Sequence, residues 1–276
     1  MTEAGIHIVV RHVGERTLEL CRDILKRQSD ASVELISATP FSETVRLGFE
    51  AGLRAGKKWT LFLDADVVPT EDCVQRLFDV AESGKETLFE AQGLIVDKVF
   101  GVRRPAGNHI YRTAFFEEAL TLLPQNAGSL RPESDTLWSM VRAGYSWYQS
   151  DVLVGLHDYG QSYADIARKV MVQYHKFPEK RDLMLARFQE QAKKDADFAV
   201  ALAACRKADR FASAPQVDAR QLRDLAAEVL HELHLDEKPP ITTNERDQLA
   251  SYAREHRDTP LDENEKTYIG LIGYHG

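Results

Sequence analysis

The sequence predicts an α/β fold, in which a mixed, largely parallel sheet is flanked by helices and followed by an all-helical C-terminal region. Up to Gly160, short apolar runs alternate with segments of helical spacing, which is typical of an α/β layer. After Ser162 the helical spacing continues without any strand pattern. We therefore expect two domains, over residues 1–160 and 161–276.

The first part of the chain supplies three strands, each followed by a helix. Strands are predicted over 6–11, 33–37 and 59–63, where apolar residues run together. The first helix is predicted over 15–28. The second opens near Thr39 or Ser42 and closes at "GKK", and the third runs to about Glu82 with Thr70 as its cap.

The middle of the chain is more irregular, and the remainder is helical. Strands are expected over 87–96 and 107–112, helices over 113–123 and 133–144, and extended chain over 145–160. Beyond that, helical spacing covers 162–177, 180–211, 218–233 and 243–256. Prolines interrupt this region between the helices, as expected for loops.

Composition and charge exclude several functional classes. A net charge of −8 argues against a protein that neutralises nucleic-acid phosphates. No apolar run reaches the roughly 18 residues of a membrane span, and "MTEAGIHIVV" lacks the pattern of a secretion signal. Cys21, Cys73 and Cys205 are far apart and lack metal-finger spacing. We expect a cytoplasmic protein that has no transmembrane segment and binds no nucleic acid.

The stretch "WTLFLDADVVP" ends an apolar strand at two acids, Asp64 and Asp66. Alternate residues of a strand point the same way, so both carboxylates are expected to aim at one point beyond the end of the strand. Ligands gather at this edge of α/β sheets, and Mg²⁺ or Mn²⁺ shared with a phosphate would relieve the repulsion. The simpler alternative is a turn before Pro69. The position between a strand and a helix favours a site.

These motifs resemble those of GT-A-fold, family-2-like glycosyltransferases. "WTLFLDADVVP" resembles the family's Asp-x-Asp (DxD) segment, "ESDTLWSMVRAGY" its acidic helix start and acceptor-facing turn, and "GNHIYRTAF" the strand between them. The resemblance spans residues 6–158 and leaves the helical C-terminus unexplained. It implies a GT-A fold (Rossmann-like, of the nucleotide-diphospho-sugar transferase kind) and the transfer of a sugar from a nucleotide-diphosphate sugar to a hydroxyl acceptor.

The resemblance also implies roles for the acids. Asp64 and Asp66 would hold Mn²⁺ or Mg²⁺ and the diphosphate, with Asp66 the direct metal ligand. Glu133 or Asp135 would be the general base that deprotonates the acceptor. Both acids equally suit helix capping. Ser134 interrupts the family's paired Glu-Asp, so the choice between them stays open.

Other residues are implied as ligands of the metal or the nucleotide. His157 in "VGLHDYGQ" stands where the family supplies a metal-binding histidine, although a structural histidine is the alternative. Arg11, Arg16 and Arg104 would contact phosphates, unless they are simply solvated. A UDP-sugar is the family's default donor, but "VELISATPFSE" lacks the expected uracil-reading Asp.

Two rival functions differ in class. A nucleotidyltransferase would usually carry a glycine-rich phosphate loop, and neither GxGxxG nor GxxxxGK[ST] occurs in the chain. A catalytically silent GT-A-like binding or scaffold protein is the other alternative. The acceptor could be a glycan, a lipid-linked species or a small molecule, and the helical C-terminus could form a homo-oligomer.

Overall fold

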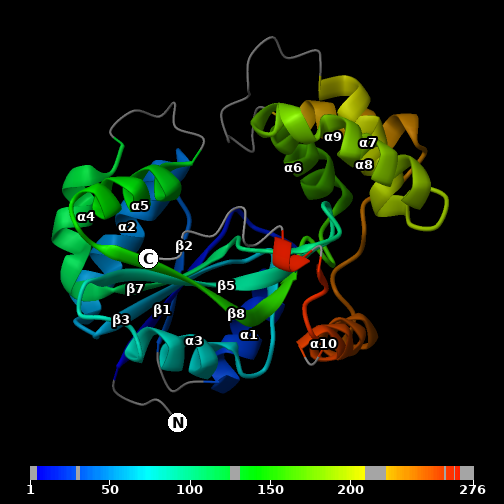
Figure 1. The fold of residues 1–276 in the computed structure, drawn as a ribbon. Helices are drawn as coiled ribbons and strands as arrows, with labels where there is room; N and C mark the ends of the chain where they lie inside the picture. The colour runs from blue at the N-terminus through cyan, green and yellow to red at the C-terminus, as the bar shows by residue number, and fades with distance from the viewer. Residues whose placement is uncertain are drawn as a thin grey trace. The chain divides into compact units, whose positions relative to one another are not determined.

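The computed structural model describes residues 5–28, 32–124, 131–208, 222–257, 259–263 and 265–267. Two compact units divide the chain: residues 1–159 together with 242–276 form the first, and residues 160–241 form the second. The first unit contains the sheet and the second is made of helices (Figure 1).

The sheet of the first unit is mixed, with the strand order β2-β1-β3-β7-β5-β8-β4, and β6 pairs with β5. Parallel pairing joins β1 to β2 and β3, and β5 to β8, whereas β4, β6 and β7 are antiparallel to their neighbours. The strands are β1 (Ile6–Arg11), β2 (Val33–Ile36), β3 (Trp59–Asp64), β4 (Val67–Pro69), β5 (Leu88–Asp97), β6 (Arg103–Arg104), β7 (Asn108–Arg112) and β8 (Ser146–His157).

Helices cover both faces of this sheet, because apolar residues occupy both sides of its central strands. In β3, Leu61 and Leu63 pack on one face, and Phe62 packs on the other. The first face carries α1 (Leu18–Gln28) and α3 (Cys73–Glu82); the second carries α2 (Phe41–Ala55), α4 (Phe116–Leu122) and α5 (Pro132–Arg142), as Figure 1 shows. The predicted α/β class, with a mixed sheet flanked by helices, is confirmed. The sheet is less parallel than expected, since four of the seven strand pairings are antiparallel.

Five parallel strands end at the same edge of the sheet, and four of them end on a charged or ionisable residue. These residues are Arg11 of β1, Asp64 of β3, Asp97 of β5 and His157 of β8. Arg11 lies opposite Asp64 in the β1–β3 register, and Asp97 lies opposite His157 in the β5–β8 register. The edge where ligands were expected is therefore lined with ionisable groups.

Local details differ from the expectations at a few places. The hydroxyl of Thr70 donates to the carbonyl of Leu153 instead of capping α3, which begins three residues later at Cys73. Thr70 is thus used to tie the loop to β8. The short strands β4 and β6 were not predicted, because runs of two or three residues give no periodicity to recognise.

All the regular secondary structure in the described residues of the second unit is helical. It consists of α6 (Tyr163–Lys176), the 3-10 turn Pro178–Lys180, α7 (Arg181–Gln191), α8 (Ala196–Ala208) and α9 (Arg223–Glu232). The hydroxyl of Ser162 caps α6 by accepting from the backbone N–H of Asp165 at 3.0 Å. The single helix expected over 180–211 is interrupted between Gln191 and Ala196, and residues 209–211 lie outside the described part.

After the second unit the chain returns to the first. Helix α10 (Thr243–Arg257) packs beside β8 and β4, and the rings of Tyr252 and Tyr159 lie 5.3 Å apart. Glu245 forms a bidentate ion pair with Arg16 at 2.6 and 2.7 Å. The compact units thus divide the chain differently from the expected single boundary after residue 160. None of the described helices combines the length and apolar character that a membrane crossing requires.

Candidate functional site

The turn that carries the acid pair is held by hydrogen bonds on both sides. Strand β3 ends at Asp64, and Ala65 and Asp66 form the turn before β4. The carbonyl of Ala65 accepts from the Thr17 hydroxyl at 2.7 Å, and the carbonyl of Asp66 accepts from the N–H of Asp158 at 3.1 Å. The two acids therefore do not share the alternation of one strand, and the structure gives them different partners.

Asp66 lies in a buried cluster with His157 and Asp158. The Nε2 atom of His157 is 3.6 Å from Oδ1 of Asp66, and its Nδ1 atom is 3.0 Å from Oδ2 of Asp158. One potential ligand atom from each residue lies within 4.8 Å of the others. The three residues are only 4–7% exposed. Asp158 has a φ of 66°, a left-handed conformation that Asp tolerates better than most residues.

A close approach of two strands brings this cluster together. Gly155 of β8 lies opposite Pro69 of β4, and Val67 lies opposite His157. A Cβ added to Gly155 would lie 2.3 Å from the carbonyl oxygen of Val68, so a side chain there would push β4 away. Glycine at this position allows the β4–β8 pairing that places Asp66 beside the end of β8.

The carboxylates hold a proton on His157. Burial by itself would lower the pKa of this imidazole, but the charges of Asp158 and Asp66 outweigh burial and raise the pKa of His157 to about 10. A cation bound here would replace that proton, because only a neutral imidazole is a metal ligand.

The residues fit a divalent cation. Two carboxylates and one imidazole form a donor set that Mn²⁺ accepts, and the carboxylate oxygens suit Mg²⁺. The geometry also agrees, since the three donors converge within 4.8 Å. Of the metal ligands that the resemblance implies, Asp66 and His157 belong to this group. Asp64 is not part of this group, and Asp158 takes its place.

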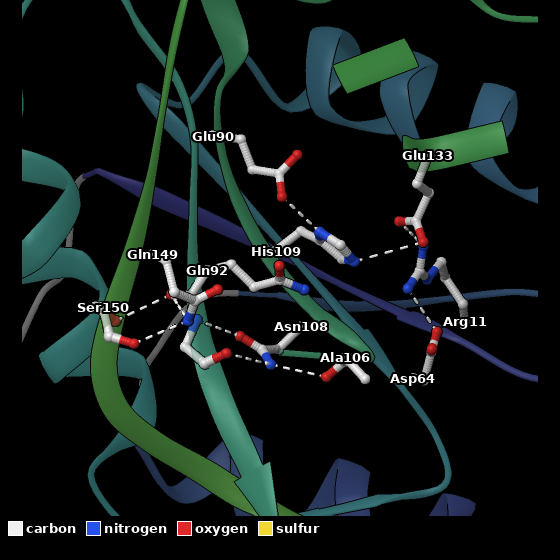
Figure 2. A network of polar contacts seen from close by, with 11 residues as sticks. Arg11, Asp64, Glu90, Gln92, Ala106, Asn108, His109, Glu133, Gln149 and Ser150 are labelled. Carbon is white, nitrogen blue, oxygen red and sulfur yellow. Dashed lines mark hydrogen bonds and ion pairs between the residues drawn. The ribbon is translucent and has the colours of Figure 1, made fainter. Parts of the chain in front are cut away.

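Asp64 belongs to a second, largely buried network, drawn in Figure 2. The guanidinium of Arg11 pairs with Asp64 at 2.6 Å and with Glu133 at the start of α5. His109 of β7 lies between two acids, with Nδ1 2.8 Å from Glu90 and Nε2 3.4 Å from Glu133. The order Glu90–His109–Glu133–Arg11–Asp64 alternates acids and bases along the whole chain of contacts.

This network lowers the basicity of Glu133. Burial alone would raise the pKa of its carboxyl group, but the charges of Arg11 and His109 hold that pKa well below its usual range. The same network raises the pKa of His109 to about 10, because Glu133 and Glu90 outweigh the opposing effect of burial. Of the two base candidates, Glu133 is therefore a weak base, and Asp135 is exposed on α5.

The arginines expected to contact phosphates all contact carboxylates. Arg11 holds Asp64 and Glu133, and its guanidinium also lies 5.2 Å from the ring centre of Phe41. Arg16 pairs with Glu245 of α10. Arg104 pairs with Asp97 at 2.6 Å. Their contacts with a nucleotide stay predictions.

Sequence reasoning missed Glu90, Asp97 and His109. Each stands inside or at the end of a predicted strand, where its neighbours suggested only a buried strand. The signal that could have found them is a charged side chain within an apolar run, as in "TLFEAQGLIVD". A buried charge needs a partner, so such a residue indicates a pair elsewhere in the sequence.

A neutral polar cluster joins β5, β7 and β8. Asn108, the first residue of β7, accepts from the N–H of Gly93 at 2.7 Å and donates to the carbonyl of Ala106 at 2.8 Å. Gln149 and Ser150 both donate to the carbonyl of Gln92 at 3.1 Å. These bonds satisfy backbone groups where the β5–β8 register is irregular.

Comparisons with known proteins found neither a matching family model nor a matching curated sequence. Solved structures with some likeness include a mannosyltransferase from Pyrobaculum calidifontis in complex with GDP-Man and Mn²⁺, 14% identical, covering 98% of this chain and 84% of that one with a TM-score of 0.40. Another is a glycosyltransferase involved in glycosylating the major capsid of PBCV-1, 13% identical over 56% of this chain and 93% of that one, with a TM-score of 0.39.

A third is 4-diphosphocytidyl-2C-methyl-D-erythritol synthase from Anaerococcus prevotii, 10% identical over 56% of this chain and 90% of that one, with a TM-score of 0.40. The neighbours thus include sugar transferases and a nucleotidyltransferase. At these TM-scores the likenesses carry no argument about activity.

Proposed function

We propose that this protein is a metal-dependent glycosyltransferase, which moves a sugar from a nucleotide-diphosphate sugar to a hydroxyl acceptor. The observation that carries the proposal is the convergence of Asp66, His157 and Asp158 at the carboxyl edge of the sheet. The sequence resemblance around "WTLFLDADVVP" supports the same assignment. A bound Mn²⁺ or Mg²⁺ would neutralise the diphosphate of the donor.

The chain's own residues divide the remaining work. Asp66, His157 and Asp158 would hold the cation. Asp64 would stay paired with Arg11 and so fix the start of the turn between β3 and β4. Asp135 is the better general base, because the pKa of Glu133 is held far below the range suited to accepting a proton. Glu133 then serves to anchor the start of α5 to the sheet through Arg11 and His109.

Calorimetric titration of UDP and GDP, each with Mn²⁺ or with a chelator, tests the donor site. We expect one nucleotide to bind only with Mn²⁺ and Asp66→Ala to weaken that binding by at least about 100-fold. Asp79→Ala is the matched control, since Asp79 is an exposed acid on α3. If neither UDP nor GDP binds to the folded wild type, both the UDP and the GDP version of the proposal are overturned.

A silent binding module is the second candidate, favoured by the pairing of Glu133 with Arg11 and His109. The two candidates differ in turnover. For a transferase, Asp135→Asn should lower donor hydrolysis or transfer by about 10²–10⁴-fold and leave metal-dependent nucleotide binding unchanged. Nucleotide binding with no hydrolysis or transfer by the wild type, with either Mn²⁺ or Mg²⁺, would instead support the silent module.

A further inference from the structure

A buried carboxylate stands behind the proposed metal site. Asp97, the last residue of β5, is fully buried and lies opposite His157 in the β5–β8 register. Its Oδ2 atom is 3.1 Å from Nδ1 of His157. Asp97 is thus in contact with a proposed metal ligand, while it lies outside the group whose donors converge.

The position of Asp97 is fixed by its other hydrogen bonds. Its Oδ1 atom accepts from the N–H of Phe100 at 2.8 Å, and its Oδ2 atom accepts from Nε of Arg104 at 2.7 Å. The backbone is held as well, because the N–H of Gly101 donates to the carbonyl of Asp97 and the N–H of Lys98 donates to that of His157. The carboxylate therefore has one orientation.

This contact distinguishes the two nitrogens of His157. Nδ1 faces Asp97 and Asp158, at 3.1 and 3.0 Å, and Nε2 faces Asp66. A carboxylate that accepts from one nitrogen fixes the tautomer and leaves the lone pair on the other. If Asp158 turns to a cation, Asp97 keeps its hold on Nδ1, because Arg104 and the N–H of Phe100 hold its oxygens in place.

We infer that Asp97, held by Arg104, is a positioning residue that orients His157 so that its Nε2 atom faces the metal. The inference rests on the proposed metal site of the transferase. It gives Arg104 a different role from the phosphate contact expected from the sequence: the guanidinium anchors the acid that orients the histidine.

The test measures Mn²⁺ affinity by calorimetry on the full-length wild type, Asp97→Asn and Glu90→Gln. Glu90→Gln is the matched control, since it breaks a buried carboxylate–histidine pair of the same kind, at 2.8 Å to His109. We expect Asp97→Asn to weaken Mn²⁺ binding about 10–100-fold and Glu90→Gln to leave it unchanged. Equal affinity of Asp97→Asn and wild type would overturn the inference alone. Failure of the folded wild type to bind Mn²⁺ would overturn the proposed metal site with it.

A spectroscopic readout separates positioning from a general loss of structure. In imidazole ¹⁵N spectra of Mg²⁺-saturated wild type, with the signal assigned by its loss in His157→Gln, we expect a protonated Nδ1 and a coordination shift at Nε2. In Asp97→Asn we expect the two nitrogens to give averaged shifts. Coordination through Nδ1 in the wild type would contradict the inference. If Asp97→Asn fails to fold, Arg104→Lys replaces it, with an expected loss of Mn²⁺ affinity of about 3- to 10-fold, and unchanged affinity would count against the inference.

Discussion

Two ionic networks reach the same edge of the sheet and have the same composition, yet they are arranged differently. Each contains one arginine, one histidine and three carboxylates. In the network of His109, acids and bases alternate along a single line of contacts. In the network of His157, Arg104 and Asp97 occupy one end, and Asp66 and Asp158 converge on the imidazole at the other.

The difference shows that arrangement, more than composition, separates a structural network from a candidate binding site. Alternating charges neutralise one another locally and fix the elements that carry them, here β1, β3, β5, β7 and α5. In the network of His157, three carboxylates, those of Asp66, Asp97 and Asp158, contact one imidazole at 3.0–3.6 Å. This arrangement concentrates negative charge, and a divalent cation is the partner that relieves it. The first network should therefore govern stability, and the second should govern ligand binding.

Removal of Arg11 should produce the largest effect on stability. Arg11 is only 2% exposed and holds two acids, so Arg11→Met leaves the partly buried carboxylates of Asp64 and Glu133 without their arginine. We expect the free energy of unfolding to fall by about 3–5 kcal/mol. Urea denaturation followed by tryptophan fluorescence measures this, because all three tryptophans lie within residues 1–159 of the first unit. A loss below about 1 kcal/mol, the range of an exposed pair, would contradict the view that the network of His109 governs stability.

Addition of Mn²⁺ should act only on the network of His157. At a hundredfold excess over its dissociation constant, a cation stabilises the folded state by about 2.7 kcal/mol. We expect a matching rise in the urea midpoint of the wild type and of Glu90→Gln, and no rise in Asp66→Asn. A rise in Asp66→Asn equal to that of the wild type would place the cation elsewhere.

The pH dependence of stability should reveal the contribution of His109. Its pKa is about 10 in the folded protein and 6.5 when unfolded, so its protonation stabilises the fold fully below pH 6.5 and loses this effect as pH rises towards 10. Glu90 and Glu133 face this ring, and Tyr111 stacks on it at 5.7 Å.

The corresponding variant is His109→Asn. We expect the difference in unfolding free energy between wild type and variant to shrink by up to about 1.4 kcal/mol for each pH unit between 7 and 9. Fluorescence-detected urea titrations at those pH values measure it. A constant difference across that range would show that His109 is uncharged in the folded protein.

The smallest effect should come from an exposed pair that belongs to neither network. Arg54 donates to Glu34 at 2.9 Å, and its side chain is 61% exposed. Arg54→Ala should change the free energy of unfolding by no more than about 1 kcal/mol, and 1 M salt should abolish the change. A larger change in the same urea titration would mean that burial does not decide how much an ion pair contributes to stability.

The sequence predicted those parts of the fold that depend on regular periodicity. Apolar runs such as 59–63 and the helical spacing of 15–28 indicated strands and helices that the structure contains. The position of Asp64 and Asp66 at an edge of the sheet was also predicted, because the apolar run that forms the strand stops just before them. Breaks such as the one between α7 and α8 escaped prediction, because polar residues continue the helical spacing through the turn.

The site was predicted only in part, because its contacts join distant segments. Position at a strand end was enough to indicate Asp66 and His157. The pairing of Arg11 with Glu133, 122 residues apart, depends on how α5 packs against the sheet, which no local pattern encodes. The alternation rule also failed for Asp64 and Asp66, because β3 ends between them.

The return of α10 to the first unit decides how the chain can be shortened. A stop codon after residue 160 would remove Glu245 and Tyr252 along with the helical unit, and so expose the side chains of Arg16 and Tyr159 that they contact. An internal deletion that joins Tyr159 to Thr242 by a linker would keep them. In topological terms, residues 160–241 are an insertion, and a fragment that retains the contacts described for the sheet unit is made of two pieces of sequence.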